Sequence, residues 1–248
     1  MNNNTLSNIQ SGLYMKFAII AAGEGSRLKD EGVTTPKPLV NINGIPMIER
    51  LIQIFHQCMD TEIIIIINER MTEVTDFINS LKKNYNIKLR IKSTPSSMHS
   101  LYEIRNLLKD DCFCLTTVDT IFKPEYFKQY INAFLTSDCD GLMGVTNYIE
   151  DEKPLYVDID NDYVVKGYYD SADYLPSNGI IYISAGVYCL KPTTLKILEN
   201  CIEAGMSRMR TFQREMVTQG MKLKAFDLNK VYDIDHKEDI IKACFALG

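Results

Sequence analysis

Residues 18–40 read AIIAAGEGSRLKDEGVTTPKPLV, and this stretch decides the fold of the chain. It begins as an apolar run and continues into a turn of small residues: Ala21, Ala22, Gly23 and Gly25. Glycine lets a backbone turn sharply and approach a ligand closely. Successive N–H groups in such a turn form a concave site for an anion. We therefore interpret these four residues as a phosphate-binding turn.

Two cations follow the turn. Arg27 comes directly after it, and Lys37 comes ten residues later, after Pro36. An arginine can bind phosphate oxygens through two N–H groups, and a lysine adds a mobile point charge. This set suits a triphosphate with a leaving pyrophosphate. The simpler alternative is a strand-to-helix turn with surface cations, but the joint pattern of strand, GxGxRL, PKPL and apolar helix favours phosphate binding.

Apolar runs and helical patterns alternate outward from this stretch. Strands are predicted at 17–22, 62–67, 87–91, 112–118 and 141–146, and helices at 46–59, 72–83, 98–108 and 124–135. Such alternation predicts a parallel sheet with helices on both faces. Later in the chain we expect a hairpin of 156–159 with 163–168 around Asn161-Asp162, strands at 180–190 and 222–228, and helices at 193–204, 211–219 and 236–247.

The predicted fold class is therefore α/β, with a Rossmann-like, mixed and mainly parallel sheet flanked by helices. Extra antiparallel strands belong to the C-terminal half. Because no segment resembles a linker, we expect one domain over 15–248, after a flexible N-terminal extension over 1–14.

Composition narrows the class of protein. The 248 residues are 46% hydrophobic and 24% charged, with a net charge of −5, and no Lys/Arg cluster stands out, which argues against a nucleic-acid partner. The seven cysteines show no CxxC spacing, and Cys112 and Cys114 share one face of a strand, which indicates core packing. No signal peptide or membrane span is visible, so we expect a cytoplasmic protein.

Residues 18–40, with NINGIPMIERLI after them, resemble the signature loop of the nucleoside-triphosphate transferase family, which includes the sugar-1-phosphate nucleotidyltransferases. No GxGxxG occurs, unlike in dinucleotide-binding proteins. The resemblance extends over residues 16 to about 245. It implies the nucleotide-diphospho-sugar transferase fold and a Mg²⁺ cofactor. It also implies two substrates, a nucleoside triphosphate and a small phosphorylated acceptor, with Arg27 and Lys37 catalytic and the small-residue turn binding the nucleotide.

Acidic residues at two places suggest a metal site. Asp119 follows a predicted strand in LTTVDTIF, and ligands collect at the carboxyl ends of strands in open α/β sheets. The resemblance makes Asp119 the family's first magnesium carboxylate, although an aspartate there can also cap a turn. VYDIDHKEDII is similar to the family's late segment that completes the metal site. Asp233 and Asp235 are both candidates, and His236-Lys237 replaces the usual Thr-Pro.

Further substrate contacts follow from the resemblance. Ser97 and Ser100, in STPSSMHSLYEIRNLL, stand where many relatives have a Gly-Thr pair that meets the nucleotide. The Ser-Leu-Tyr run is closer to phosphocholine-type cytidylyltransferases, and a plain helix N-cap by Ser96 or Ser97 is the alternative. Gly186, in ISAGVYCL, is expected to bind the acceptor. We do not recognise the family's Glu-Lys-Pro acceptor motif, and Lys166, followed by Tyr168-Tyr169-Asp170, occupies roughly its place as a candidate acceptor contact.

Three functions remain open. The first is a nucleotidyltransferase that condenses an NTP with a sugar-1-phosphate to an NDP-sugar and pyrophosphate. The second is a cytidylyltransferase for a phosphorylated small alcohol such as phosphocholine. The third is a non-catalytic nucleotide-binding regulatory module. The joint presence of Arg27, Lys37 and Asp119 argues against this third function. The oligomeric state is open as well, and a homo-oligomer is one option.

The acceptor side distinguishes the two enzymes. A quaternary ammonium favours aromatic faces, whereas a sugar needs several fixed polar partners. Tyrosines are frequent in the second half: Tyr148, Tyr156, Tyr163, Tyr168, Tyr169, Tyr174, Tyr182 and Tyr188. Three rings converging on a small cavity beside Lys37 and Asp119 would favour choline. A wider polar cleft near Gly186 would favour a sugar.

Overall fold

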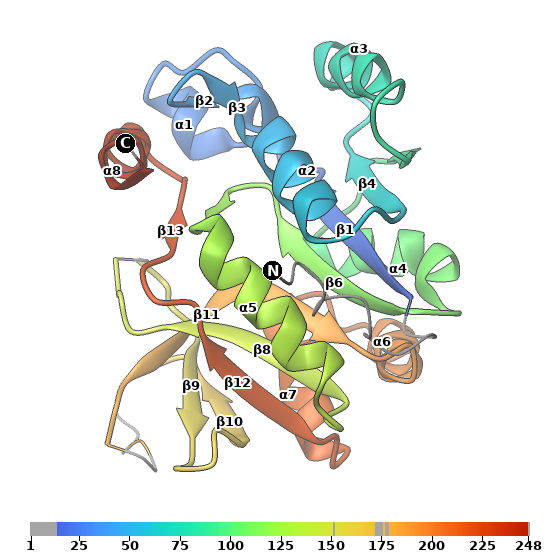
Figure 1. The fold of residues 1–248 in the computed structure, drawn as a ribbon, viewed down its shortest axis with the longest axis vertical. Helices are drawn as coiled ribbons and strands as arrows, with labels where there is room; N and C mark the ends of the chain where they lie inside the picture. Colours follow the sequence, from blue (N-terminus) through green and yellow to red (C-terminus); the bar gives the residue numbers. More distant parts are fainter. Residues whose placement is uncertain (1–13, 151, 172–175, 177–178, 248) are drawn as a thin grey trace, which may run out of the picture.

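The structure is a computed structural model that describes residues 14–150, 152–171, 176 and 179–247. A mixed sheet forms its centre, and helices cover both of its faces (Figure 1). The N-terminal extension predicted over residues 1–14 lies almost wholly outside the described residues, and so does Tyr174.

The N-terminal half builds the parallel part of the sheet. Its strands are β1 Met15–Ala21, β4 Ile63–Ile67, β5 Ile87–Ile91 and β6 Cys112–Thr117. Strand β1 lies between β4 and β6, and β5 is the outer neighbour of β4, all in parallel. Helices α2 Met47–Cys58, α3 Thr72–Leu81 and α4 Ser97–Leu108 connect them. The predicted alternation of strands and helices is confirmed.

The C-terminal half adds five strands to the same sheet. They are β8 Gly141–Thr146, β9 Tyr156–Ile159, β10 Val165–Tyr169, β11 Tyr182–Leu190 and β12 Leu223–Asp227. Strand β11 joins the halves, because it pairs antiparallel with β6, β8 and β9. Strand β12 runs parallel to β8. The predicted mixed sheet with extra antiparallel strands is therefore confirmed.

The hairpin of β9 and β10 is antiparallel, as predicted. The carboxylate of Asp160 holds its turn by accepting the N–H groups of Asp162 at 3.0 Å and Val164 at 2.9 Å. The residue with a positive backbone angle in this turn is Tyr163, with φ 60. A side chain at positive φ is strained, and the bonds to Asp160 offset that cost.

Four longer helices complete the layers, namely α5 Pro124–Leu135, α6 Thr194–Glu203, α7 Met209–Thr218 and α8 Lys237–Leu247. Short elements that the sequence analysis did not predict surround the carboxyl ends of the strands. They are α1 Ser26–Asp30, the 3₁₀ turn η1 Lys37–Leu39, β2 Asn41–Ile42, β3 Ile45–Pro46, β7 Thr120–Ile121 and β13 Tyr232–Asp233. Each of these elements is too short to produce a recognisable hydrophobic periodicity in the sequence, so it could not be predicted. Pro46 precedes α2 as its N-cap rather than opening the helix.

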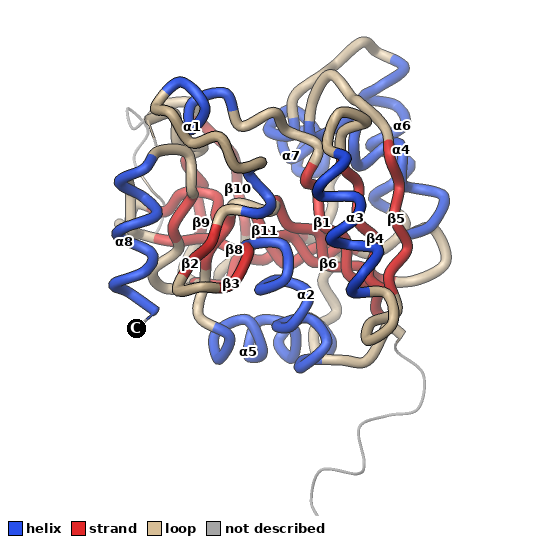
Figure 2. The backbone as a smooth tube through the Cα atoms, turned by 90° about the horizontal axis from the view of Figure 1, so that it is seen from above, coloured by secondary structure: helices blue, strands red, loops and turns tan. Residues whose placement is uncertain are grey.

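Two apolar clusters pack on opposite faces of the sheet. In β1, Phe17 and Ile19 face the cluster that includes residues of α2, α3 and α5. Ala18 and Ile20 face the cluster that includes residues of α4, α6 and α7. Figure 2 shows α2 and α5 on one side of the strands and α4, α6 and α7 on the other. Burial on both faces explains why these strands read as continuous apolar runs.

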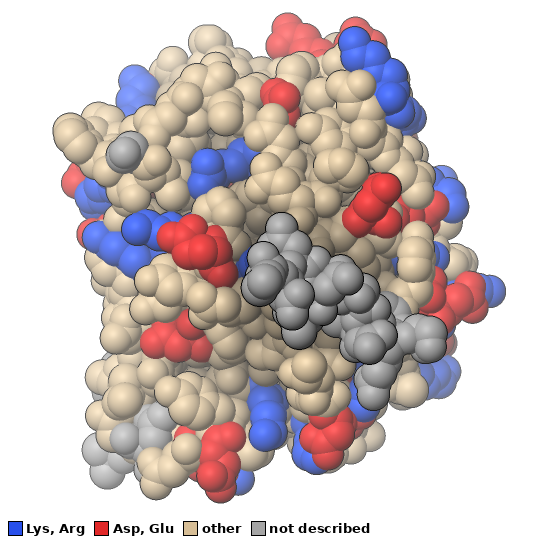
Figure 3. Space-filling model, in the orientation of Figure 1, with Lys and Arg blue, Asp and Glu red and all other residues tan. Residues whose placement is uncertain are grey.

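Two surface observations bear on partners. On the face seen in Figure 3, acidic and basic side chains are interspersed and no broad patch of one sign forms. Among the helices of the described chain, none combines the length and the hydrophobicity needed to cross a bilayer. The expectations about nucleic acid and cytoplasmic location remain predictions.

Candidate active site

Two cavities open at the carboxyl ends of the parallel strands and share a wall. The N-terminal cavity encloses about 740 Å³, and its lining comes mainly from the signature loop, the segment 93–97 and Asp119. The C-terminal cavity encloses about 600 Å³, and its lining comes mainly from residues 146–150, 152–155, 183–188, 207–213 and 231–239. The shared lining residues are Arg27, Ser96, Ser97, Thr117 and Asp235. A ligand in one cavity therefore lies next to a ligand in the other.

The signature loop turns at Gly25. This residue has φ 62 and forms the N-cap of α1, and a Cβ built on it would lie 3.0 Å from Cβ of Lys37. Only glycine combines that backbone angle with so close a neighbour. Gly23 has open space where its side chain would be. Together with Ala21 and Ala22, both glycines line the N-terminal cavity, as predicted for a turn that approaches a ligand.

Lys37 lies at the centre of the site. It begins η1 and only 8% of its side chain is exposed. Its ammonium lies 2.6 Å from Oδ2 of Asp119 and 2.8 Å from Oδ1 of Asp235. Arg27 pairs with the second oxygen of Asp235. Both predicted cations therefore meet the predicted metal ligands.

Burial and charge oppose each other at this ion pair. Burial alone would lower the pKa of Lys37, but the carboxylates of Asp119 and Asp235 outweigh it and raise the pKa. Burial would raise the pKa of Asp119, and the ammonium of Lys37 instead holds that pKa below its ordinary value. Both groups are therefore charged at neutral pH.

Three carboxylates form what we call the carboxylate cluster: Asp119, Asp233 and Asp235. One oxygen of each lies within 4.8 Å of the others. The pairing of β13 with β7 brings them together, because Asp233 pairs with Thr120 and the N–H of Ile234 donates to the carbonyl of Asp119 at 3.1 Å. Carboxylate oxygens are the ligands that Mg²⁺ prefers, so the donor set fits such an ion. Both Asp233 and Asp235 lie in this cluster, and their binding of a metal stays a prediction.

The two predicted serines have different environments. Ser97 lines both cavities, while Ser100 is buried at the edge of the N-terminal cavity, with its hydroxyl 2.6 Å from that of Thr94. Ser96 is the N-cap of α4, because its hydroxyl accepts the N–H of His99 at 3.4 Å. The capping alternative thus applies to Ser96, and Ser97 remains available to a ligand.

Gly186 lines the C-terminal cavity where the pairing of β11 with β8 shifts register between Ser184 and Tyr188. Its φ is 73, and a Cβ there would lie 2.9 Å from Oγ1 of Thr120. Glycine is therefore required for both backbone angle and space. This close approach brings β11 against β7 beside the carboxylate cluster.

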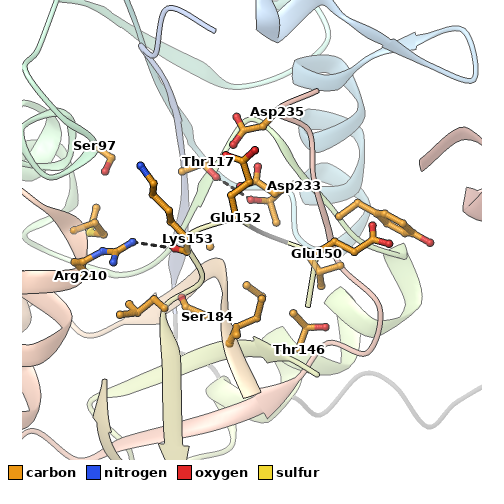
Figure 4. Close-up of a pocket in the computed structure, with 18 of the residues that line it drawn as sticks. Ser97, Thr117, Thr146, Glu150, Glu152, Lys153, Ser184, Arg210, Asp233 and Asp235 are labelled. Carbon is orange, nitrogen blue, oxygen red and sulfur yellow. Dashed lines mark hydrogen bonds between the residues drawn. The ribbon is translucent and has the colours of Figure 1, made fainter. Parts of the chain in front are cut away.

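Lys166 is not part of this arrangement. It lies on β10, pairs with Asp160 at 2.8 Å, and lines neither cavity. The tripeptide Glu152-Lys153-Pro154 occurs earlier in the chain, and Glu152 and Lys153 line the C-terminal cavity. Figure 4 shows Lys153 reaching into the cavity between Glu152 and Ser97. The expectation that the chain lacks the Glu-Lys-Pro motif was therefore wrong, because Glu152-Lys153-Pro154 is readable in the sequence itself.

The C-terminal cavity has a mixed polar lining. Hydroxyl, amide and charged side chains contribute, among them Thr146, Ser184, Gln213, Glu150 and Arg210. Tyrosines line it as well: Tyr148, Tyr188 and Tyr232. Lys37 and Asp119 line the other cavity. The cavity near Gly186 therefore combines polar groups with three tyrosine rings, and the choice between the two acceptors stays a prediction.

Two of these rings already bind a cation from the chain. Tyr148 and Tyr232 meet edge to face at 5.3 Å between centroids. The ammonium of Lys230 lies 4.0 Å from the Tyr148 ring centroid and 5.0 Å from that of Tyr232. Tyr232 was not among the tyrosines that the sequence analysis considered.

Comparisons with known proteins identify sequence relatives that match most of this chain. The chain is 25% identical over 232 residues to the bifunctional protein GlmU of Methanococcus maripaludis, covering 92% of this chain and 53% of that protein. It is 25% identical over 233 residues to the mannose-1-phosphate guanyltransferase of Saccharomyces cerevisiae, covering 92% of this chain and 63% of the relative. The chain thus spans about half to two thirds of the length of these relatives.

Among solved structures, the inositol-1-phosphate CTP transferase from T. maritima superposes with a TM-score of 0.75 at 17% identity, over 96% of this chain and 99% of that one. This likeness confirms the fold. The model of the MobA-like NTP transferase domain matches residues 17–186, which include the signature loop, Asp119 and Gly186. The chain therefore belongs to the MobA-like NTP transferase domain family.

Proposed function

We propose that this chain is a nucleotidyltransferase that joins the NMP part of a nucleoside triphosphate to a sugar-1-phosphate and releases pyrophosphate. The observation that carries the proposal is the meeting of Arg27, Lys37 and the carboxylate cluster at the wall shared by two cavities. The name of one sequence relative, mannose-1-phosphate guanyltransferase, supports a sugar phosphate as the acceptor.

The N-terminal cavity would hold the nucleoside triphosphate. The N–H groups of the turn at Gly23 and Gly25 would bind phosphate oxygens, and Arg27 would neutralise charge on the departing pyrophosphate. The carboxylate cluster would bind Mg²⁺, which supplies a positive charge that neutralises triphosphate oxygens when it is bound. A regulatory module would need a binding turn, but not two cations at an acidic cluster.

The C-terminal cavity would hold the acceptor. Lys37 would exchange its carboxylate partners for the α-phosphate and the acceptor phosphate and hold them together. An acceptor phosphate oxygen then attacks the α-phosphorus in line, and the bond from that phosphorus to the bridging oxygen breaks. The phosphate is already anionic, so no general base is required, and catalysis consists of positioning and charge neutralisation.

A screen for pyrophosphate release tests this function. Four nucleoside triphosphates are each combined with a panel of sugar-1-phosphates and with phosphocholine. We expect release with one triphosphate and one sugar-1-phosphate. EDTA should abolish pyrophosphate release by the wild type, and added Mg²⁺ or Mn²⁺ should restore it. The variant Asp119→Asn should release no pyrophosphate even with these ions present. Nucleotide binding without release for any pair would instead support a regulatory module.

A cytidylyltransferase for phosphocholine is the second candidate. The observation in its favour is the pair Tyr148 and Tyr232, which already accommodates the ammonium of Lys230. A quaternary ammonium could take that position, since aromatic faces attract cations. Release from CTP with phosphocholine, exceeding release with every sugar-1-phosphate, would replace the sugar proposal with this one.

A further inference from the structure

The turn between β13 and α8 carries Asp235, and it is held from the side of α8 by Asp239. One oxygen of Asp239 accepts the backbone N–H groups of Asp235 at 3.0 Å and of His236 at 2.7 Å. Both N–H groups would otherwise lack partners at the start of the helix. These bonds fix the backbone of the turn that presents Asp235 to the carboxylate cluster.

Glu31 holds the same turn from the side of the signature loop. One of its oxygens lies 2.5 Å from Nδ1 of His236, and the other accepts the N–H of Lys237 at 2.8 Å. Glu31 stands four residues after Arg27, and residues at that spacing lie on one face of a helix. Arg27 contacts Asp235 while Glu31 contacts the next residue. The α1 region therefore binds two consecutive residues of the turn.

The second ring nitrogen of His236 faces the acceptor side. Nε2 is buried, has no hydrogen-bond partner among the described residues, and lies 3.5 Å from Oε1 of Glu152. A buried polar atom without a partner is unfavourable, and a small approach of Glu152 would supply the missing bond. Glu152 is followed by Lys153, whose carbonyl accepts from Arg210 at 3.2 Å. One imidazole thus contacts the signature loop and faces the Glu-Lys-Pro segment.

We infer that His236 is a positioning residue with two separate tasks. Through Nδ1 and Glu31 it orients the turn that carries Asp235. Through Nε2 and Glu152 it orients the Glu-Lys-Pro segment against the C-terminal cavity. This inference rests on the proposed function and adds that the metal turn and the acceptor segment are ordered by the same side chain. The family's usual threonine at this position has one short hydroxyl and cannot face both carboxylates.

Two substitutions separate the tasks. In His236→Asn the amide nitrogen lies near the former Nδ1, so the bond to Glu31 is kept and the contact with Glu152 is lost. In His236→Gln the amide nitrogen lies near the former Nε2, so the contact with Glu152 is kept and the bond to Glu31 is lost. Mn²⁺ affinity by titration calorimetry reports on the metal turn, and the KM for the acceptor reports on the segment.

We expect His236→Gln to weaken Mn²⁺ binding by about tenfold, as for other side chains that orient a metal ligand, and to leave the acceptor KM within about twofold. We expect His236→Asn to leave Mn²⁺ affinity unchanged and to raise the KM for the acceptor about tenfold at unchanged kcat. His56→Asn is the matched control, because His56 makes a similar pair with Asp60, at 3.4 Å, and lines neither cavity. It should leave both readouts unchanged.

Equal behaviour of the Asn and Gln variants in both assays, whether unchanged or equally impaired, would overturn the inference. Failure of the wild-type chain to release pyrophosphate from any substrate pair would remove the proposed function. The calorimetric comparison does not need an acceptor, so it would still decide whether His236 orients the metal turn.

Discussion

Replacing Gly186 with alanine should destabilise the protein through one identifiable contact. The residue has φ 73, and its Cβ would lie 2.9 Å from Oγ1 of Thr120. An L-residue with a left-handed backbone costs roughly 1–2 kcal/mol. Crowding in a packed interior adds about 1–3 kcal/mol. The total loss in the free energy of unfolding should therefore be about 2–5 kcal/mol.

Gly220→Ala is the matched control for the backbone. Gly220 has φ 75, and nothing lies within 4 Å of its would-be Cβ. This variant should lose only the backbone part, about 1–2 kcal/mol. The difference between the two variants measures the crowding at Thr120.

Thr120→Ala tests the contact itself. It removes the crowded oxygen and also a hydroxyl–hydroxyl bond of 2.8 Å to Thr117, at a cost of about 0.5–1.5 kcal/mol. In this background Gly186→Ala should cost no more than Gly220→Ala does in the wild type. Urea unfolding with unchanged m-values gives all the free energies. If Gly186→Ala costs the same in both backgrounds, the contact is not the cause and the reasoning is refuted.

Four other outcomes are expected. Arg27→Ala should reduce turnover by orders of magnitude and leave the unfolding midpoint unchanged, because its half-exposed side chain faces the cavities; near-normal turnover would exclude it from the active site. Lys37→Met should strengthen Mn²⁺ binding without nucleotide by about tenfold, since it removes a competing cation from the carboxylate cluster; unchanged affinity in calorimetry would contradict this. Phe127→Ala should lower the free energy of unfolding, measured with urea, by about 3–5 kcal/mol, because its buried ring packs among four aromatic neighbours. A decrease of less than about 1 kcal/mol would contradict that packing. Asp140 accepts the backbone N–H of Lys222, which holds its pKa below the ordinary value. The wild type should therefore be more stable than Asp140→Asn above about pH 4, and this advantage should vanish as the pH falls through the lowered pKa; a difference that does not depend on pH would refute the role of the charge.

The sequence alone determined which segments become strands and helices, where the signature loop lies, and the types of residue that form the site. Short, continuous and β-branched apolar runs such as 63–67 are typical of strands covered on both faces, so the local pattern was enough to predict the parallel half. Gly25 and Lys37 were recognised because the chain between them is short and its order is visible in the sequence.

Only the tertiary structure decided which distant residues meet. The pairing of β13 with β7 places both Asp233 and Asp235 beside Asp119, whereas spacing along the chain left the two as alternatives. Lys166 was the only candidate acceptor lysine named from the sequence, but it pairs with Asp160 on the β9–β10 hairpin, whereas Lys153 of the overlooked Glu-Lys-Pro tripeptide lines the cavity. His236 stands 205 positions from Glu31, its partner. Such contacts depend on how the strands order themselves across the sheet, and no local period encodes that order.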